Sequence, residues 1–138
     1  MELEIGLTYE EEKIVSPEDS AVQYNSGLVD VFSTPALVAF MEKTCMDCVD
    51  PLLEPDYCTV GIEINVKHLK ATRIGDTVRS IAKLIKIEGN VLSFEVKAYD
   101  SIGLIADGIY KRFIIHKPTF LLKLAQQYDN KWDLNILS

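Results

Sequence analysis

The sequence predicts an α+β fold in which one long helix is wrapped by an antiparallel sheet. Two observations carry this prediction. Residues 35–49 form a long and unusually apolar helical segment, and four strand-like segments follow it without an intervening helix. An apolar helix has to be covered by other elements, and consecutive strands without crossover helices are typical of an antiparallel sheet. We therefore expect the helix to lie at the centre of the domain.

The composition is that of a small folded domain. Its 138 residues are 48% hydrophobic, enough for a core and too apolar for a disordered chain. We expect residues 1–138 to form a single domain. Neither a signal peptide nor an apolar run of membrane-spanning length is visible, which predicts a cytoplasmic protein without a membrane partner. The net charge of −7 argues against a nucleic-acid partner.

An N-terminal strand and the central helix come first. The strand is predicted by the alternation of Leu3, Ile5, Leu7 and Tyr9. The helix is predicted over Pro35–Val49 by its two ends. Ser33 and Thr34 are capping residue types, with Thr34 expected as the N-cap before a proline in the first turn, and Asp50-Pro51 ends the segment.

Four strands are predicted after the helix, connected as a meander. In Thr59–Leu69 the alternation places one set of apolar residues on a single face, namely Val60, Ile62, Ile64 and Val66. The later strands are expected over 77–87, about 92–98 and 104–116, with turn signals at Glu88-Gly89-Asn90 and Ser101-Ile102-Gly103. A short C-terminal helix is predicted over Thr119–Gln127.

The cysteines are interpreted as core residues. Cys45 and Cys48 form a C-x-x-C sequence and Cys58 follows. A zinc site needs four ligands, and only His68 and His116 are left to complete one. A redox pair normally opens a helix, whereas this pair lies deep inside one. We therefore expect no metal.

Glu42 is the carboxylate of the helix that lies outside its polar arc. At about 100° per residue its neighbours on the helix surface are Val38, Met46 and Val49. In such a setting the carboxylate is expected to be partly desolvated. It is either a functional residue or a structural acid with hydrogen-bond partners, and this feature alone leaves both open.

His68 and Thr34 are further candidates, each with an ordinary structural explanation. His68 continues the face of Ile64 and Val66, so we expect it to point inward, where a histidine can be a satisfied core residue. The hydroxyl of Thr34 can cap the helix, and the helix N-terminus also suits a developing anion.

These residues and their spacing resemble the hotdog-fold acyl-CoA thioesterases of the fluoroacetyl-CoA thioesterase family. The resemblance covers about residues 30–116, through Thr34-Pro35, Glu42, Thr59-Val60-Gly61, Val66 to Thr72, Gly75, Gly103 to Gly108 and Arg112-Phe113. It implies Thr34, Glu42 and His68 as catalytic residues lying together. It implies Gly61 and Arg112 as substrate-binding residues.

The resemblance also implies hydrolysis of a short-chain acyl-CoA to free acid and coenzyme A, without a cofactor. Glu42 could act as general base or as nucleophile, and His68 could pass a proton to the leaving thiolate or polarise the substrate. Thr34 could position Glu42 or a water, and the backbone N–H near Gly61 could bind the carbonyl oxygen. A homodimer with active sites at its interface is expected. The alternative is a non-catalytic acyl-CoA-binding module of the same fold.

Two segments bear on the substrate. The resemblance implies aromatic residues around the site in the fluoroacetyl-specific member of the family. Here the segment Tyr24–Phe32 has Leu28 and Val29 in its middle and aromatic residues only at its ends. The acyl group is therefore not assigned from the sequence. The cations of the turn after the Thr59–Leu69 strand could meet the phosphates of coenzyme A or could simply be solvated; they are Lys67, Lys70 and Arg73.

Overall fold

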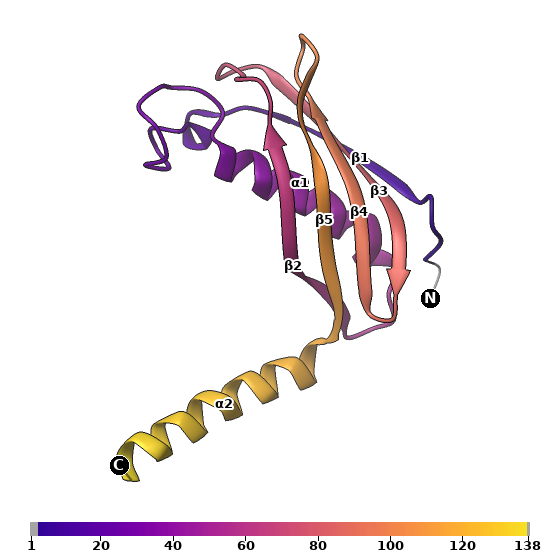
Figure 1. The fold of residues 1–138 in the computed structure, drawn as a ribbon, viewed down its shortest axis with the longest axis vertical. Helices are drawn as coiled ribbons and strands as arrows, with labels where there is room; N and C mark the ends of the chain where they lie inside the picture. Colours follow the sequence, from indigo (N-terminus) through magenta and orange to yellow (C-terminus); the bar gives the residue numbers. More distant parts are fainter. Residues whose placement is uncertain (1–2, 138) are drawn as a thin grey trace.

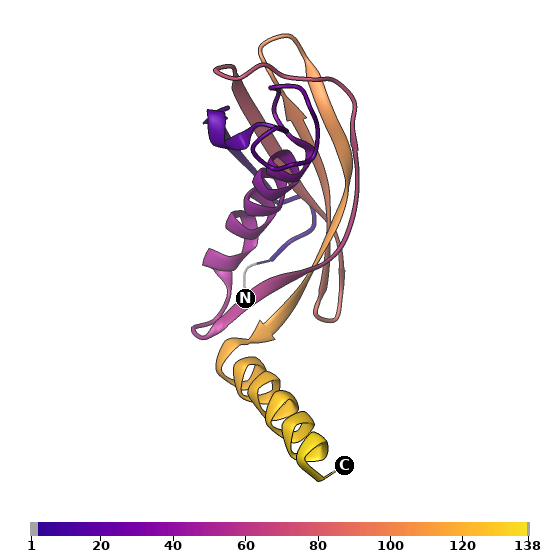
Figure 2. The ribbon, with the colours of Figure 1, turned by 90° about the vertical axis from the view of Figure 1, so that its left-hand side faces the viewer.

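The computed structural model describes residues 3–137 and the side chains of residues 3–129. A five-stranded antiparallel sheet curves around helix α1 (Thr34–Val49), and helix α2 (Lys117–Leu137) extends away from one end of the sheet (Figures 1 and 2). The strands are β1 (Thr8–Ile14), β2 (Tyr57–His68), β3 (Thr77–Glu88), β4 (Val91–Tyr99) and β5 (Leu104–His116). The predicted α+β architecture is confirmed.

Helix α1 begins one residue earlier than predicted, and its cap is a different residue. Ser33 has extended backbone angles, and its side-chain oxygen accepts a hydrogen bond from the Ala36 N–H at 3.1 Å. The prediction of Thr34 as the N-cap is therefore wrong, because the hydroxyl of Ser33 already satisfies the first turn. Thr34 is the first helical residue, and its hydroxyl is available for another partner.

The core forms between one stripe of α1 and the inner face of the sheet. Leu37, Met41, Cys45 and Val49 recur every fourth residue and are each at most 1% exposed. They belong to one apolar cluster with side chains of β3 and β4, including Leu84, Leu92, Phe94 and Val96. Burial of each large side chain contributes roughly 1.5–3 kcal/mol, so this stripe fixes α1 on the sheet.

The two cysteines of the C-x-x-C sequence are buried, which confirms their interpretation as core residues. Burial raises the pKa of the Cys48 thiol to about 11 and also raises that of Cys45. Both thiols are therefore protonated near neutral pH, which is not the state in which a thiol binds a metal or attacks a disulfide.

The sheet order is β1-β3-β4-β5-β2, so β2 pairs with β5 and not with β3. The predicted four-strand meander is wrong for this strand, although β3, β4 and β5 do follow one another. The connection of residues 69–76 is long enough to cross the end of the sheet, whereas a hairpin needs a short turn. Strands β3 and β4 form such a hairpin, with Gly89 at φ 60°. As a result, β1 and β2 are the two edge strands.

A β-bulge in β2 changes which residues face α1. The register against β5 shifts between Gly61 and Glu63, so Gly61 pairs with Arg112 before the bulge and His68 pairs with Ala106 after it. The prediction that Val60 and Ile62 share a face with Ile64 and Val66 is therefore wrong, because a strict alternation of faces cannot reveal an inserted residue. The inward direction of His68 is confirmed. Its helix-facing companions after the bulge are Ile64 and Val66.

Helix α2 contains the predicted range Thr119–Gln127 and is longer at both ends. Pro118 lies in its first turn, where a missing N–H is tolerated. The helix touches the rest of the molecule at β5, and both views show it pointing away from the sheet (Figures 1 and 2). Among the residues described, no helix is both long and apolar enough to cross a membrane.

Candidate active site

Thr34 and His68 meet at one end of the sheet. Thr34 Oγ1 lies 2.7 Å from His68 Nδ1, which joins the first residue of α1 to the last residue of β2. Burial lowers the pKa of His68 from its usual range, so the ring is neutral near pH 7. When the ring proton is on Nε2, Thr34 donates its hydroxyl proton to Nδ1. His68 Nε2 is buried and has no hydrogen-bond partner among the described residues.

A cavity of about 330 Å³ lies beside this pair, within the usual size range of small-molecule sites. The segment before α1 contributes Ala21 and Ser26 to its wall, and the neighbouring Leu28 is 99% exposed. The other lining residues are Val31, Phe32, Ser33, Thr34, His68, Leu69, Lys70 and Ala71. The segment with an aliphatic middle therefore borders the candidate site.

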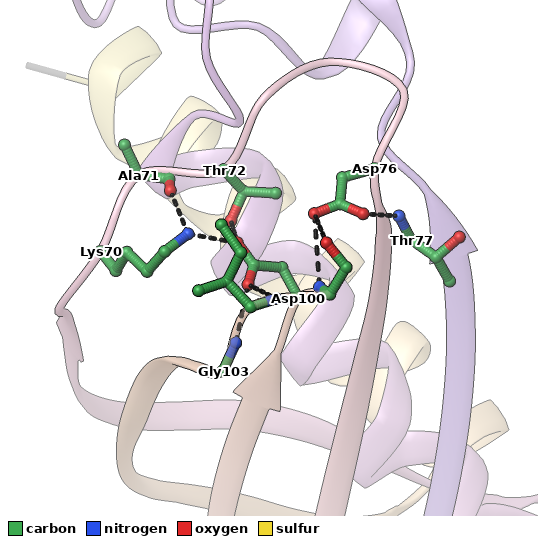
Figure 3. A network of polar contacts seen from close by, with 9 residues as sticks. Lys70, Ala71, Thr72, Asp76, Thr77, Asp100 and Gly103 are labelled. Carbon is green, nitrogen blue, oxygen red and sulfur yellow. Dashed lines mark hydrogen bonds and ion pairs between the residues drawn. The ribbon is translucent and has the colours of Figure 1, made fainter.

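A buried carboxylate network supports the Thr34–His68 end of the fold (Figure 3). The side chain of Asp100 is 1% exposed and accepts hydrogen bonds from Lys70 Nζ at 2.6 Å and Thr72 Oγ1 at 2.8 Å. Burial by itself would raise the pKa of Asp100. The hydrogen bonds from Lys70, Thr72 and the backbone N–H groups of Ile102 and Gly103 outweigh it and hold the pKa at about 2.

This network connects the loop after His68 to the segment before Thr34. The carbonyl of Thr72 accepts a hydrogen bond from the Phe32 N–H at 2.9 Å, two residues before α1. Nearby, Asp76 accepts a hydrogen bond from the hydroxyl of Ser101, which fixes the same loop to the β4–β5 turn (Figure 3). Lys70, for which the sequence left open a phosphate contact or a solvated cation, is therefore engaged within the protein.

Glu42 lies on a side of α1 that the sheet does not cover. Its side chain is exposed in the single chain, so the predicted desolvation is wrong for one protomer. Helix α1 packs mainly against β1 and β3 and less against β2. The stripe that contains Val38 and Met46 is consequently left half-buried at the margin of the domain.

Gly61 faces Glu42 from β2. A Cβ atom at Gly61 would lie 3.3 Å from Glu42 Oε2 and would overlap the hydroxyl of Tyr110. Arg112 is 4% exposed, and its Nη1 donates to that hydroxyl at 3.0 Å. The structure thus places Glu42, Gly61 and, through Tyr110, Arg112 in a second group. Sequence reasoning missed Tyr110, although a residue two positions from Arg112 on a strand shares its face.

The predicted site residues therefore form two groups in one chain. Glu42 is eight positions after Thr34, about 12 Å along an α-helix. No hydrogen bond or ion pair among the described residues joins the two groups. Within one protomer Glu42 is therefore not joined to Thr34 or His68, and their meeting in one site stays a prediction that depends on the expected dimer.

Comparison with known proteins identifies the family. The sequence pattern of the family FlK, fluoroacetyl-CoA-specific thioesterase, matches residues 15–118. The fluoroacetyl-CoA thioesterase of Streptantibioticus cattleyicolor is 38% identical over 98 residues, 71% of this chain and 70% of that protein.

Solved structures agree with this result. A variant of fluoroacetyl-CoA thioesterase FlK in complex with acetyl-CoA has a TM-score of 0.85 at 30% identity, covering 91% of this chain and 98% of that chain. A Thermus thermophilus thioesterase superfamily member has a TM-score of 0.86 at 26% identity, covering 97% and 99%. The protein is a hotdog-fold thioesterase, and it belongs to the fluoroacetyl-CoA-specific thioesterase family.

Proposed function

We propose that the protein hydrolyses short-chain acyl-CoA thioesters to a free acid and coenzyme A, with Thr34, Glu42 and His68 as catalytic residues. The observation that carries this proposal is the Thr34–His68 hydrogen bond of 2.7 Å beside a cavity of about 330 Å³. The curated relative is named for a thioester of coenzyme A, and a similar structure holds acetyl-CoA.

The chemistry follows from the groups available. Glu42 takes a proton from water as the water oxygen bonds to the thioester carbon, and the carbon–sulfur bond then breaks to release the thiolate. Direct attack by the carboxylate, giving an anhydride that water cleaves, uses the same residue. The lowered pKa of His68 favours a neutral ring that donates an Nε2–H hydrogen bond to the developing negative charge.

We further propose that the active site is completed by a second copy of the chain. The backbone of β2 is unpaired along one edge, and Ile62 and Ile64 beside it are 51% and 42% exposed. A two-fold axis at this edge pairs two β2 strands antiparallel, so the Gly61 half of one strand meets the His68 end of the other. Glu42 of one protomer then acts with Thr34 and His68 of the partner subunit. The expected mass is about 31 kDa, twice 15.5 kDa.

We propose a cytoplasmic location and one functional domain over residues 1–138. Cys45, Cys48 and Cys58 are all unpaired, which suits a reducing compartment.

The proposed reaction is tested by measuring coenzyme A release from acetyl-, propionyl-, butyryl- and fluoroacetyl-CoA. We expect saturable hydrolysis of at least one of these thioesters. Calorimetric titration with the same compounds distinguishes an enzyme from a binding module. Tight binding of acyl-CoA without release of coenzyme A would contradict the proposed function.

A further inference from the structure

Arg112 is a buried cation that can only donate hydrogen bonds. Its Nε donates to Thr59 Oγ1 at 2.6 Å and its Nη2 donates to the Thr59 carbonyl at 2.8 Å. The hydroxyl of Thr59 in turn donates to Asp50 Oδ1 at 2.6 Å, just past the end of α1. These contacts hold the guanidinium rigidly, with Nη1 directed at the hydroxyl of Tyr110.

The contact with Arg112 sets the direction of the Tyr110 hydroxyl. Because Nη1 donates to the Tyr110 oxygen at 3.0 Å, the hydroxyl proton has to point to an acceptor elsewhere. The acceptor beside it is the Glu42 carboxylate, since a Cβ atom at Gly61 would overlap the Tyr110 hydroxyl and lie 3.3 Å from Glu42 Oε2. Burial raises the pKa of Tyr110, and Glu42 as a hydrogen-bond acceptor raises it further, in agreement with this placement. A hydroxyl that already accepts from a guanidinium is also polarised, which strengthens the bond that it donates.

Gly61 makes this contact possible. Tyr110 and Glu42 both reach into the space that a side chain at Gly61 would fill. Gly61 is not in the left-handed backbone region, so conformation does not require a glycine here. A glycine is required because a side chain at this position would occupy the space between the Tyr110 hydroxyl and the Glu42 carboxylate.

We propose that Tyr110 is a positioning residue that holds the Glu42 carboxylate in its reactive orientation, with Arg112 aiming the Tyr110 hydroxyl. This inference rests on the proposed role of Glu42 in thioester hydrolysis. Glu42 is exposed in the single chain and its side chain would otherwise sample several rotamers. One hydrogen bond from a fixed donor selects the rotamer over Gly61, where the attack on the thioester takes place.

The test is Tyr110→Phe, which keeps the ring and removes the hydroxyl. With acetyl-CoA as substrate we expect kcat to fall about 10-fold while KM changes less than about twofold, because the lost contact aligns Glu42 and does not bind substrate. Tyr99→Phe is the matched control, since Tyr99 lies on β4 with its ring against Arg79. The control is expected to keep wild-type kcat.

A double-mutant cycle separates positioning from a general structural role. In a Glu42→Gln background, Tyr110→Phe is expected to lower residual hydrolysis less than twofold, because the two residues act as one unit. If Tyr110→Phe folds poorly, Gly61→Ala replaces it, since the added methyl group displaces the hydroxyl and is expected to lower kcat similarly.

Two results would overturn the inference while the proposed function stands. One is a wild-type kcat in Tyr110→Phe. The other is a Tyr110→Phe substitution that lowers hydrolysis by the same factor in the wild-type and the Glu42→Gln backgrounds. A wild-type protein that releases no coenzyme A from acetyl-CoA or the other thioesters would overturn the proposed function itself, and the inference with it.

Discussion

The two halves of the candidate site are built in different ways. At the Thr34–His68 half, two loops are clamped by a buried carboxylate, Asp100. At the Glu42 half, an exposed side chain is approached by the rigid strand pair β2–β5 through Gly61 and Arg112. The first half is complete within one chain, whereas the second is open on one side. In the proposed dimer, the second half is the one that the partner subunit covers.

The largest expected effect on kcat is that of a substitution at Glu42, in the half of the site that is open on one side. Glu42→Gln removes the proposed base or nucleophile, so kcat on a short acyl-CoA is expected to fall roughly 10²-fold or more. Because Glu42 is exposed in one protomer, the thermal midpoint is expected to move by only a few degrees. Steady-state kinetics and a thermal scan measure both. Near-wild-type turnover in a folded Glu42→Gln protein would remove Glu42 from the mechanism.

The next prediction tests whether the two halves come from different protomers. Co-expression of Glu42→Gln with His68→Ala is expected to restore about a quarter of wild-type activity, because half of the dimers are mixed and each mixed dimer has one intact site. Each variant alone is expected to be nearly inactive. Mixed preparations without recovered activity would show that each site uses residues of one chain.

At the closed half, Asp100→Asn is expected to destabilise the fold. The pKa of Asp100 is lowered to about 2, so its ionised form stabilises the folded state above the unfolded pKa of about 4. This contribution, about 2 kcal/mol, is lost as pH falls through the folded pKa. Urea unfolding should therefore show a difference from wild type at pH 7 that shrinks toward pH 2. Glu95→Gln, exposed on β4, is the control, and an equal loss in it would refute the assignment.

Because loop 69–73 is tied to the segment before Thr34, Asp100→Asn is also expected to lower kcat about 10-fold through a looser Thr34–His68 pair. Unchanged kcat at a temperature where the variant is folded would show that the clamp serves stability alone.

The smallest expected effect concerns the cations that could meet the phosphates of coenzyme A. Lys70 forms an ion pair with Asp100, whereas Lys67 and Arg73 are exposed and can still meet a phosphate. Lys67→Ala is expected to raise KM for acetyl-CoA about threefold with kcat unchanged, and the effect should weaken at high salt. Lys83→Ala on β3 is the control. Equal KM values for both variants would argue that Lys67 is simply solvated.

Much of the fold can be predicted from local sequence patterns. The ends of α1, the β3–β4 hairpin at Gly89 and the inward direction of His68 all follow from capping, turn and alternation signals. The pairing of β2 with β5 does not, because strand order depends on long-range contacts that leave no period in the sequence. The bulge after Gly61 cannot be predicted from the sequence either. One inserted residue changes which side chains of β2 face α1, but it leaves the composition of the strand unchanged.

The sequence names candidate site residues one at a time but does not give their arrangement in space. Thr34 and His68 lie at the ends of elements whose boundaries the sequence shows, and their contact is present in the structure. Glu42 was placed among apolar neighbours correctly, yet its exposure depends on how far α1 extends over β2. Tyr110 looks like an ordinary strand aromatic, and only the packing shows its contact with Arg112.

The two edges of the sheet also differ in how readily another strand can pair with them. The free edge of β2 carries half-exposed isoleucines, whereas β1 carries Glu10, Glu11, Glu12 and Lys13 in succession. A row of charges along an edge strand discourages another strand from adding to it. Growth by strand addition can therefore start at β2 and is opposed at β1. In the proposed dimer the β2 edges pair with each other and the charged β1 edges stay at the outside. The dimer is therefore expected to resist extension into fibres at high concentration.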